Sequence, residues 1–387
     1  MHSLGEEEID EVCDTLRSSW ITSGPKVERF EKDFARYIGV KHAFAVNSCT
    51  AGLHLGLEAV GVKENDLVVT TPYTFTSTSE VIGYLGADPL FIDIKEDTFL
   101  LDVKKVAEYF EKSCFQREGN LFDEKTQRRI AAIVPVHIAG QSCDMDSLSG
   151  LSERFNVPVV EDAAHSLPTT YKNRMIGTIG DVTAFSFYAT KTITTGEGGM
   201  VTTNNDKVAA RIKIMRLHGI NRDSWNRNKE KTPSWSYQVV ESGFKYNMTD
   251  IAASIGIHQL KKADSFHQSR TEIAQKYNEA FAHIEGLKTP LVESYGTHSW
   301  HLYILQISAE NMERDLFIEK LAEQGIATSV HFIPLHVQPF YQREYGFQSE
   351  DFPVAYKSFQ KVVSLPIYPK MTEADVERVI ESVLKIM

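Results

Sequence analysis

An aspartate and a lysine that follow predicted strands are the residues with the clearest chemical potential in the sequence. Asp162 closes the apolar run 157–163, which places it at the carboxyl edge of a predicted sheet, where doubly wound folds bind ligands. Lys191 comes after a second predicted strand, 181–187, and before the glycine-rich turn 195–199. Neighbouring loops can therefore bring a carboxylate and an ε-amine into one pocket.

Such a pair meets the requirements of a pyridoxal phosphate site. The lysine amine can form a Schiff base with an aldehyde, and a carboxylate keeps the pyridine nitrogen protonated so that the ring can accept electrons. On spacing alone, a surface ion pair or two unrelated solvated residues is the commoner case, because charges at loop edges are frequent and mostly structural. Both interpretations stay open at this point.

The segments that would position Asp162 and Lys191 alternate between short β-rich runs and longer helical patterns. This alternation predicts an α/β fold with a mostly parallel sheet flanked by helices on both faces. The run 131–137 is apolar on both side-chain parities, as expected for a strand that is covered on both faces. The seven predicted strands are residues 43–47, 67–72, 89–94, 130–137, 157–163, 181–187 and 199–204.

The pattern changes after residue 250 and predicts a second, smaller domain. Residues 251–284 have helical spacing over a length that could link two lobes. A strand at 301–308, a helix at 314–323 and a strand at 328–333 then predict a small C-terminal α+β domain. We therefore expect a large domain at 1–250 and a linking helix with the small domain at 251–387. The polar stretch 221–236 is interpreted as a mobile surface loop.

Composition excludes several classes of function. The 387 residues carry 41 basic and 52 acidic side chains, a formal charge of −11, which argues against a nucleic-acid binder. No long apolar run or basic leader is present, so we expect a soluble, cytoplasmic chain without membrane contact. The cysteines lack CxxC spacing and predict a reducing compartment rather than disulfides or a zinc site. They are Cys13, Cys49, Cys114 and Cys143.

Three segments resemble the signature of the nucleotide-sugar aminotransferases, a family of fold-type I pyridoxal phosphate enzymes. They are EDAAHS (161–166), FSFYATK (185–191) and TGEGGM (195–200). Seven further similar stretches follow the family's order and cover nearly the whole chain, so chance is a poor explanation. These are ITSGPKVERFE (21–31), NSCTAGLHLGL (47–57), TPYTFTST (71–78), PVHIAGQSCDMD (135–146), GFKYNMTDIAASIGIHQL (243–260), SWHLY (299–303) and SLPIYPKMT (364–372).

The resemblance implies a role for each matching residue. Lys191 matches the catalytic lysine that binds the cofactor aldehyde and later moves a proton between the amino-acid carbon and the cofactor's C4′ carbon. Asp162 matches the partner of the ring nitrogen, and Ser186 supplies a hydroxyl to the phosphate. His165 matches a position beside the phenolic oxygen of the ring, with a core histidine as the alternative.

Two further groups complete the expected cofactor site. Thr50 and Ala51 lie where the strand 43–47 gives way to a helical pattern, so their amides would face an anion at a helix N-terminus. Either Ser48 or Thr50 could cap this helix. By resemblance, Phe75 stacks on the cofactor ring, and its alternative is a core aromatic.

A last cofactor residue implies a homodimer with shared active sites. Asn247 matches a region that, in this family, reaches into the neighbouring subunit's site and touches the phosphate. Many relatives carry Asn at position 245 and Arg at 247, whereas the Lys245 and Asn247 found here resemble a subgroup that acts on UDP-linked 4-keto sugars. Whether Lys245 faces the sugar or the cofactor stays open, as does the role of Tyr188, where several relatives carry His.

The implied reaction is a ping-pong transamination with pyridoxal 5′-phosphate. L-Glutamate would pass its nitrogen to the cofactor, giving pyridoxamine 5′-phosphate, which would then aminate the C4 ketone of a nucleotide-linked, preferably UDP-linked, 4-keto sugar. A related sugar dehydratase would carry His in place of Lys191, and a non-catalytic regulator that keeps the fold is a further alternative. A nicotinamide enzyme lacks its GxGxxG fingerprint, and a metal hydrolase lacks HExxH or paired ligand spacing.

Overall fold

The main sheet contains the seven predicted strands. The computed structural model describes residues 3–221, 237–309 and 312–387. The strand order is β1 (His42–Val46), β11 (Gly199–Thr203), β10 (Val182–Ser186), β7 (Val160–Asp162), β6 (Arg129–Ile133), β2 (Leu67–Thr70) and β3 (Asp88–Phe91). Parallel bridges from Ile133 to Val159 and from Val136 to Asp162 join β6 to β7. β11 runs antiparallel to both neighbours, and the other adjacent pairs are parallel, which confirms the predicted mostly parallel sheet.

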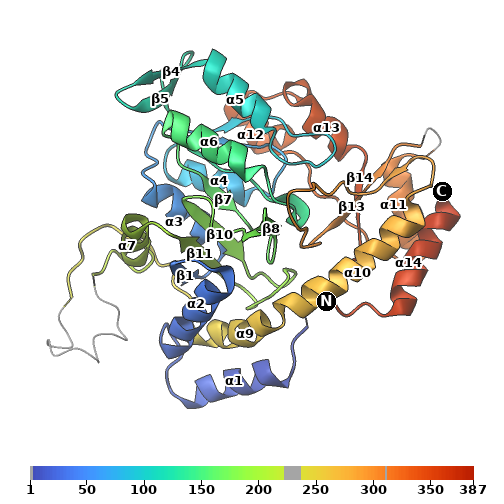
Figure 1. Ribbon diagram of the computed structural model, residues 1–387, viewed down its shortest axis with the longest axis horizontal. Helices are drawn as coiled ribbons and strands as arrows, with labels where there is room; N and C mark the ends of the chain where they lie inside the picture. The colour runs from blue at the N-terminus through green and yellow to red at the C-terminus, as the bar shows by residue number, and fades with distance from the viewer. Residues whose placement is uncertain (1–2, 222–236, 310–311) are drawn as a thin grey trace.

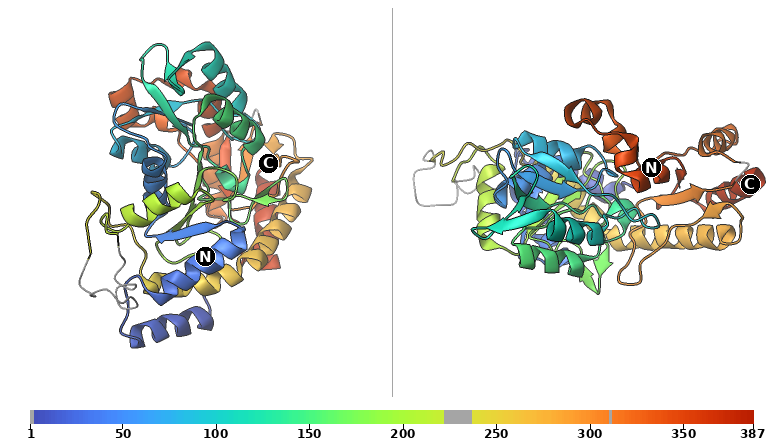
Figure 2. Two further views of the ribbon diagram at one scale, coloured as in Figure 1. Left: turned by 60° about the vertical axis from the view of Figure 1, so that its left-hand side comes forward. Right: turned by 90° about the horizontal axis from the view of Figure 1, so that it is seen from above.

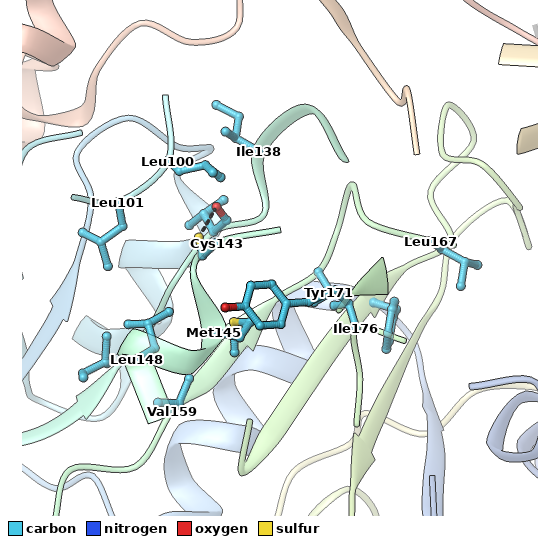
Figure 3. Close-up of a cluster of buried hydrophobic side chains, with 14 of the residues drawn as sticks. Leu100, Leu101, Ile138, Cys143, Met145, Leu148, Val159, Leu167, Tyr171 and Ile176 are labelled. Carbon is cyan, nitrogen blue, oxygen red and sulfur yellow. Dashed lines mark hydrogen bonds between the residues drawn. The ribbon is translucent and has the colours of Figure 1, made fainter. Parts of the chain in front are cut away.

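Helices cover both faces of this sheet (Figure 1). One apolar cluster packs α2 (Pro25–Ile38), α5 (Val103–Lys112), α6 (Met145–Phe155) and α9 (Asp250–Lys261) against one face; Figure 3 shows its part around Met145 and Tyr171. A second cluster packs α3 (Cys49–Ala59), α4 (Ser77–Tyr84) and α7 (Asp206–Met215) against the other. Burial on both faces explains why residues of either parity in these strands are apolar.

Two hairpins lie outside the sequence-based prediction. β4 (Cys114–Arg117) and β5 (Asn120–Asp123) pair through a turn in which Glu118 and Gly119 both have positive φ, the conformation that tight hairpin turns require. β5 pairs with the first half of β6, and the bridge from β6 toward β7 begins at the end of β6. A shorter hairpin joins β8 (Thr170–Tyr171) to β9 (Arg174–Met175).

The C-terminal lobe has its own sheet and core (Figure 2). The predicted helical stretch is α9 followed by α10 (Ala263–Phe281), with a break at Lys262, and it runs from the main sheet into this lobe. Its sheet contains β12 (Leu287–Lys288), β13 (Tyr303–Ile307) and β14 (Val362–Leu365). An apolar cluster formed by residues from Ile273 onward fills its interior. The domain boundary near residue 250 stays a prediction.

The predicted strand at 301–308 and helix at 314–323 are confirmed as β13 and α11 (Arg314–Glu323). The predicted strand at 328–333 is wrong: it contributes one bridge, from Ser329 to Ser364, and β14 is the strand that pairs with β13. The reason is burial, because Val362 and Val363 are fully buried whereas Ser329 is exposed. The remaining α-helices of the described residues are α1 (Glu6–Arg17), α12 (Pro339–Tyr345), α13 (Pro353–Phe359) and α14 (Glu373–Ile386).

Two further expectations concern the exterior of the chain. Most of the loop expected at 221–236 lies outside the described residues. Within the described ranges, no helix is both long and apolar enough to cross a membrane.

Candidate active site

Most of the predicted cofactor residues line one cavity. It has a volume of about 560 Å³ and lies where β7 and β10 end and α3 begins. The loop after β2, the turn after β10 and residues of the C-terminal lobe complete its wall. The predicted residues that line it are Thr50, Phe75, Asp162, His165, Ser186 and Lys191.

The Asp162 carboxylate is held in one orientation by hydrogen bonds. The Thr78 hydroxyl donates to Oδ2 at 2.7 Å, and the Ala164 amide donates to Oδ1 at 3.1 Å. The Thr74 and Thr78 hydroxyls in turn lie 2.8 Å apart. Because Asp162 is 5% exposed and is the last residue of β7, its carboxyl group has a fixed position in the cavity wall.

Lys191 lies in the turn after β10, where its amide donates to the Tyr188 carbonyl at 2.9 Å. Burial lowers the pKa of the Lys191 amine to about 8, and the negative charge of Asp162 offsets only part of that effect. A lysine with a lowered pKa is available as a neutral nucleophile near neutral pH. The amine of Lys191 and the carboxylate of Asp162 therefore line the same cavity.

The start of α3 is the candidate phosphate site, and the structure shows which residue caps the helix. Ser48 is the N-cap: its hydroxyl accepts the Ala51 amide at 3.0 Å, and its carbonyl accepts the Gly52 amide at 3.1 Å. The amides of Cys49 and Thr50 precede this first intrahelical hydrogen bond and lie at the positive end of the helix dipole. The Ala51 amide donates to this cap, and its expected contact with the phosphate stays a prediction.

Histidines form another part of the wall. His165 Nδ1 accepts the Ala139 amide at 3.2 Å, so Nε2 carries the proton. Burial, together with Lys191 and two further histidines, lowers the pKa of His165, which keeps its ring neutral. The His301 ring centroid lies 4.3 Å from that of His165, and His331 also lines the cavity.

The C-terminal histidines were not among the predicted site residues. His301 follows a segment that is hydrogen bonded to the His165 loop, since the Ser299 hydroxyl donates to the His165 carbonyl at 2.6 Å. By resemblance, His301 in the motif SWHLY (299–303) and His331 match positions that border the sugar pocket, but histidines that pack at strand ends are the commoner case. Tyr188, whose role the sequence leaves open, also lines the cavity.

Asn247 lies elsewhere, in a second cleft of about 720 Å³ that Lys245, Ser23 and Arg216 also line. Its side-chain amide donates to the Ser23 hydroxyl at 2.6 Å, and its oxygen accepts from the Lys245 amine. Of the predicted cofactor residues, only Asn247 reaches this cleft, so we assign the chemistry to the smaller cavity. Its contribution to a neighbouring subunit's site stays a prediction.

The residues present fit pyridoxal 5′-phosphate. The cavity combines a lysine amine, a fixed carboxylate, a helix N-terminus with the Ser186 hydroxyl, and an aromatic ring, Phe75, that is 60% exposed. These are the groups required for the aldehyde, the ring nitrogen, the phosphate and the ring face of the cofactor.

Comparisons with known proteins agree with this chemistry. SpsC, a spore coat polysaccharide biosynthesis protein of Bacillus subtilis, is 46% identical over 99% of this chain and 95% of its own length. A putative sugar aminotransferase of Streptococcus pneumoniae, Spr1654, has been solved in PLP and PMP forms. Its PMP form shares 33% identity, covers 100% of this chain and 97% of its own, and superposes with a TM-score of 0.88.

The aminotransferase PseC of Helicobacter pylori, involved in the biosynthesis of pseudoaminic acid, shares 27% identity. It covers 99% of this chain and 97% of its own, with a TM-score of 0.88. Residues 2–384 match the DegT/DnrJ/EryC1/StrS aminotransferase family. The resemblance to nucleotide-sugar aminotransferases is thereby confirmed, and pyridoxal 5′-phosphate is the cofactor. The chain belongs to the DegT/DnrJ/EryC1/StrS family and is a pyridoxal phosphate-dependent sugar aminotransferase.

Proposed function

We propose that this enzyme transfers the amino group of L-glutamate to the C4 ketone of a UDP-linked 4-keto sugar, giving a 4-amino sugar nucleotide. The observation that carries the transamination is the cavity shared by Lys191 and Asp162. Support for a sugar substrate comes from SpsC and PseC, which serve polysaccharide and pseudoaminic acid biosynthesis. The Lys245 and Asn247 arrangement supports the UDP-linked class, by its resemblance to that subgroup.

The residues of the cavity divide the work between them. Asp162 would hold the ring nitrogen, Ser186 and the amides at the start of α3 would hold the phosphate, and Phe75 would cover the ring. When bound, the cofactor supplies an electron sink for the carbon that carries the amine. Lys191 would take a proton from the amino donor and return one to the sugar carbon, which sets the new stereocentre.

The sugar diphosphate needs cations that this cavity lacks. Among the described residues that line it, Lys191 is the only lysine or arginine, and the neutral histidines suit hydroxyl groups better than phosphates. We propose that Lys245 and Asn247 of a second subunit approach the mouth of the cavity, so that a homodimer forms each complete site.

The four cysteines are free, which supports the proposed cytoplasmic location.

The test is a product assay with glutamate and a panel of UDP-linked 4-keto sugars, with product configuration determined by NMR. Formation of 2-oxoglutarate and a UDP-linked 4-amino sugar, absent with Lys191→Ala, is the expected result. If the enzyme aminates 4-keto sugars linked to another nucleotide but not those linked to UDP, the UDP assignment is overturned. Turnover with a donor other than glutamate would overturn the donor assignment alone.

A further inference from the structure

Two fully buried titratable residues at the cofactor site, one of which lines the cavity, have no role in the chemistry described above. They are His137, from the motif PVHIAGQSCDMD, and Glu161, from the motif EDAAHS. Both are 0% exposed, and His137 Nε2 lies 2.8 Å from Glu161 Oε2. A carboxylate is costly to bury unless it is paired and hydrogen bonded, so the contacts of Glu161 decide what this pair can do.

Every polar atom of this pair is satisfied. Glu161 Oε1 accepts the Gly180 amide at 2.8 Å and the Thr183 hydroxyl at 2.7 Å. His137 Nδ1 accepts the Cys143 amide at 3.0 Å, which leaves the Nε2 proton to point at Glu161. The network thus joins β7 to β10 and to the segment after β6. Cys143 is itself fixed in the apolar cluster (Figure 3).

The same segments hold the backbone of Asp162. The Asp162 amide donates to the Pro135 carbonyl at 2.9 Å, and the His137 amide donates to the Asp162 carbonyl at 3.1 Å. Because side chains alternate along a strand, Glu161 and Asp162 project to opposite faces of β7. A side-chain tie at Glu161 therefore fixes the backbone from which the Asp162 carboxylate projects into the cavity.

We propose that the buried Glu161–His137 pair positions Asp162 against the ring nitrogen of the cofactor. The Thr78 hydroxyl and the Ala164 amide fix the Asp162 carboxylate itself. The Glu161–His137 pair instead fixes the backbone of the strand that carries Asp162. The inference rests on the assignment of Asp162 to the ring nitrogen, and it does not depend on which sugar or amino donor the enzyme uses.

Glu161→Gln is the informative substitution because it keeps the size of the side chain but cannot satisfy the network. If the NH2 group of the glutamine faces His137, two donors meet, because His137 Nε2 carries a proton. Moving that proton to Nδ1 would remove this conflict but would place the Nδ1 proton against the Cys143 amide. With its carbonyl facing His137, the amide would instead meet the Gly180 amide and the Thr183 hydroxyl. One contact is lost in either orientation.

The test is a double-mutant cycle on cofactor affinity, measured by titrating the apo-protein with pyridoxal 5′-phosphate. In the chain with Asp162 intact, Glu161→Gln is expected to weaken binding about tenfold, which equals about 1.4 kcal/mol of binding free energy. In the Asp162→Asn background, the same substitution is expected to change affinity less than about twofold, because the interaction that the pair supports is already lost. Thr183→Val, a milder change, should give a smaller loss with the same dependence on Asp162.

A matched control separates this role from general stability. Tyr109→Phe removes a hydrogen bond to the Asp123 carboxylate, which is 2% exposed and lies in the hairpin strand β5. This variant should lower the melting temperature and leave cofactor affinity unchanged.

Three outcomes would overturn the proposal. Equal losses of affinity from Glu161→Gln in both backgrounds would show that the pair acts only on stability. Unchanged affinity of both Glu161→Gln and Thr183→Val, with a defect in Asp162→Asn, would show that the pair does not act on Asp162. An Asp162→Asn variant that binds the cofactor normally would overturn the assignment of Asp162, while the product assay would still test the proposed substrates independently.

Discussion

The lowered pKa of Lys191 sets how readily this residue can react with an aldehyde. With a pKa of about 8, roughly a tenth of the amine is neutral at pH 7, compared with about 0.03% at the ordinary value of 10.5. The cause is burial in the cavity wall rather than a neighbouring cation, and the nearby charge of Asp162 acts in the opposite direction. Anything that admits water to this wall should therefore raise the pKa of the amine.

Replacing Lys191 by alanine should abolish covalent attachment of the cofactor and reduce transamination at least about a thousandfold, because the same amine serves as nucleophile and proton carrier. Borohydride reduction followed by mass spectrometry is the measurement, with Lys288→Ala at an exposed lysine as the control. A reducible adduct on the Lys191→Ala variant would contradict the assignment.

The rate at which the apo-protein captures pyridoxal 5′-phosphate should rise with pH and reach half of its maximum at about pH 8. The sign follows from the lowered pKa, because the reactive neutral amine accumulates above that value and is lost below it. Stopped-flow absorbance between pH 6 and pH 10 would measure the profile. A midpoint near the ordinary lysine pKa would show that the amine is not buried in solution.

At the scale of elements, helix α1 docks on α9 through polar side chains. The Thr15 and Ser254 hydroxyls lie 2.6 Å apart, and Glu11 contacts Lys26 and His258. Although burial opposes its charge, hydrogen bonds from Lys26 and His258 lower the pKa of Glu11 to about 2. The attachment of α1 therefore depends on an ionised carboxylate.

This attachment should weaken in acid. Since the pKa of Glu11 is lower in the folded chain than its ordinary value of 4.5, its contribution is complete above about pH 4.5 and is lost as the pH falls toward 2. We expect Glu11→Gln to cost about 1–2 kcal/mol of unfolding free energy at pH 7 after solvent screening. Hydrogen exchange of α1 would measure it, with Glu7→Gln on the exposed side as the control; equal effects of the two variants would contradict the prediction.

The elements differ in how well the sequence predicts them. The seven strands of the main sheet are predictable because each is a short, largely apolar run between helical patterns, and most of them are buried on both faces. The hairpin β4–β5 is not, because its strands carry Gln116, Arg117 and Asn120 and its turn uses a glutamate at positive φ. Residues 328–333 have a strand-like composition, but pairing is decided by the burial of β14, which only the tertiary structure shows.

The site shows the same limit. The positions of Asp162 and Lys191 at the ends of predicted strands indicate that they share a pocket. Phe75, His165 and Ser186 are predicted from the family resemblance alone. The engagement of the Ala51 amide by Ser48 depends on which of two hydroxyls caps α3, a choice that local sequence leaves open. The histidines of the C-terminal lobe reach the cavity only because the two lobes pack together.

At the scale of the whole molecule, one chain leaves Asn247 outside the cavity that holds Lys191, so the proposed homodimer has a direct test. Lys191→Ala and Asn247→Asp chains should each be inactive, the second because its carboxylate would repel the phosphate. Mixed after unfolding and refolding, they should recover about a quarter of wild-type activity, since half of the dimers are hybrids with one intact site. Refolded mixtures that stay inactive, while wild-type chains treated alike recover, would contradict shared sites.

The cavity wall draws residues from Ser48 near the start of the chain to Phe332 near its end. A nascent polypeptide still emerging from the ribosome, or a fragment cut between the lobes, cannot assemble that wall. Because the coenzyme binds the folded chain alone, its concentration should shift the balance between folded and unfolded protein by mass action.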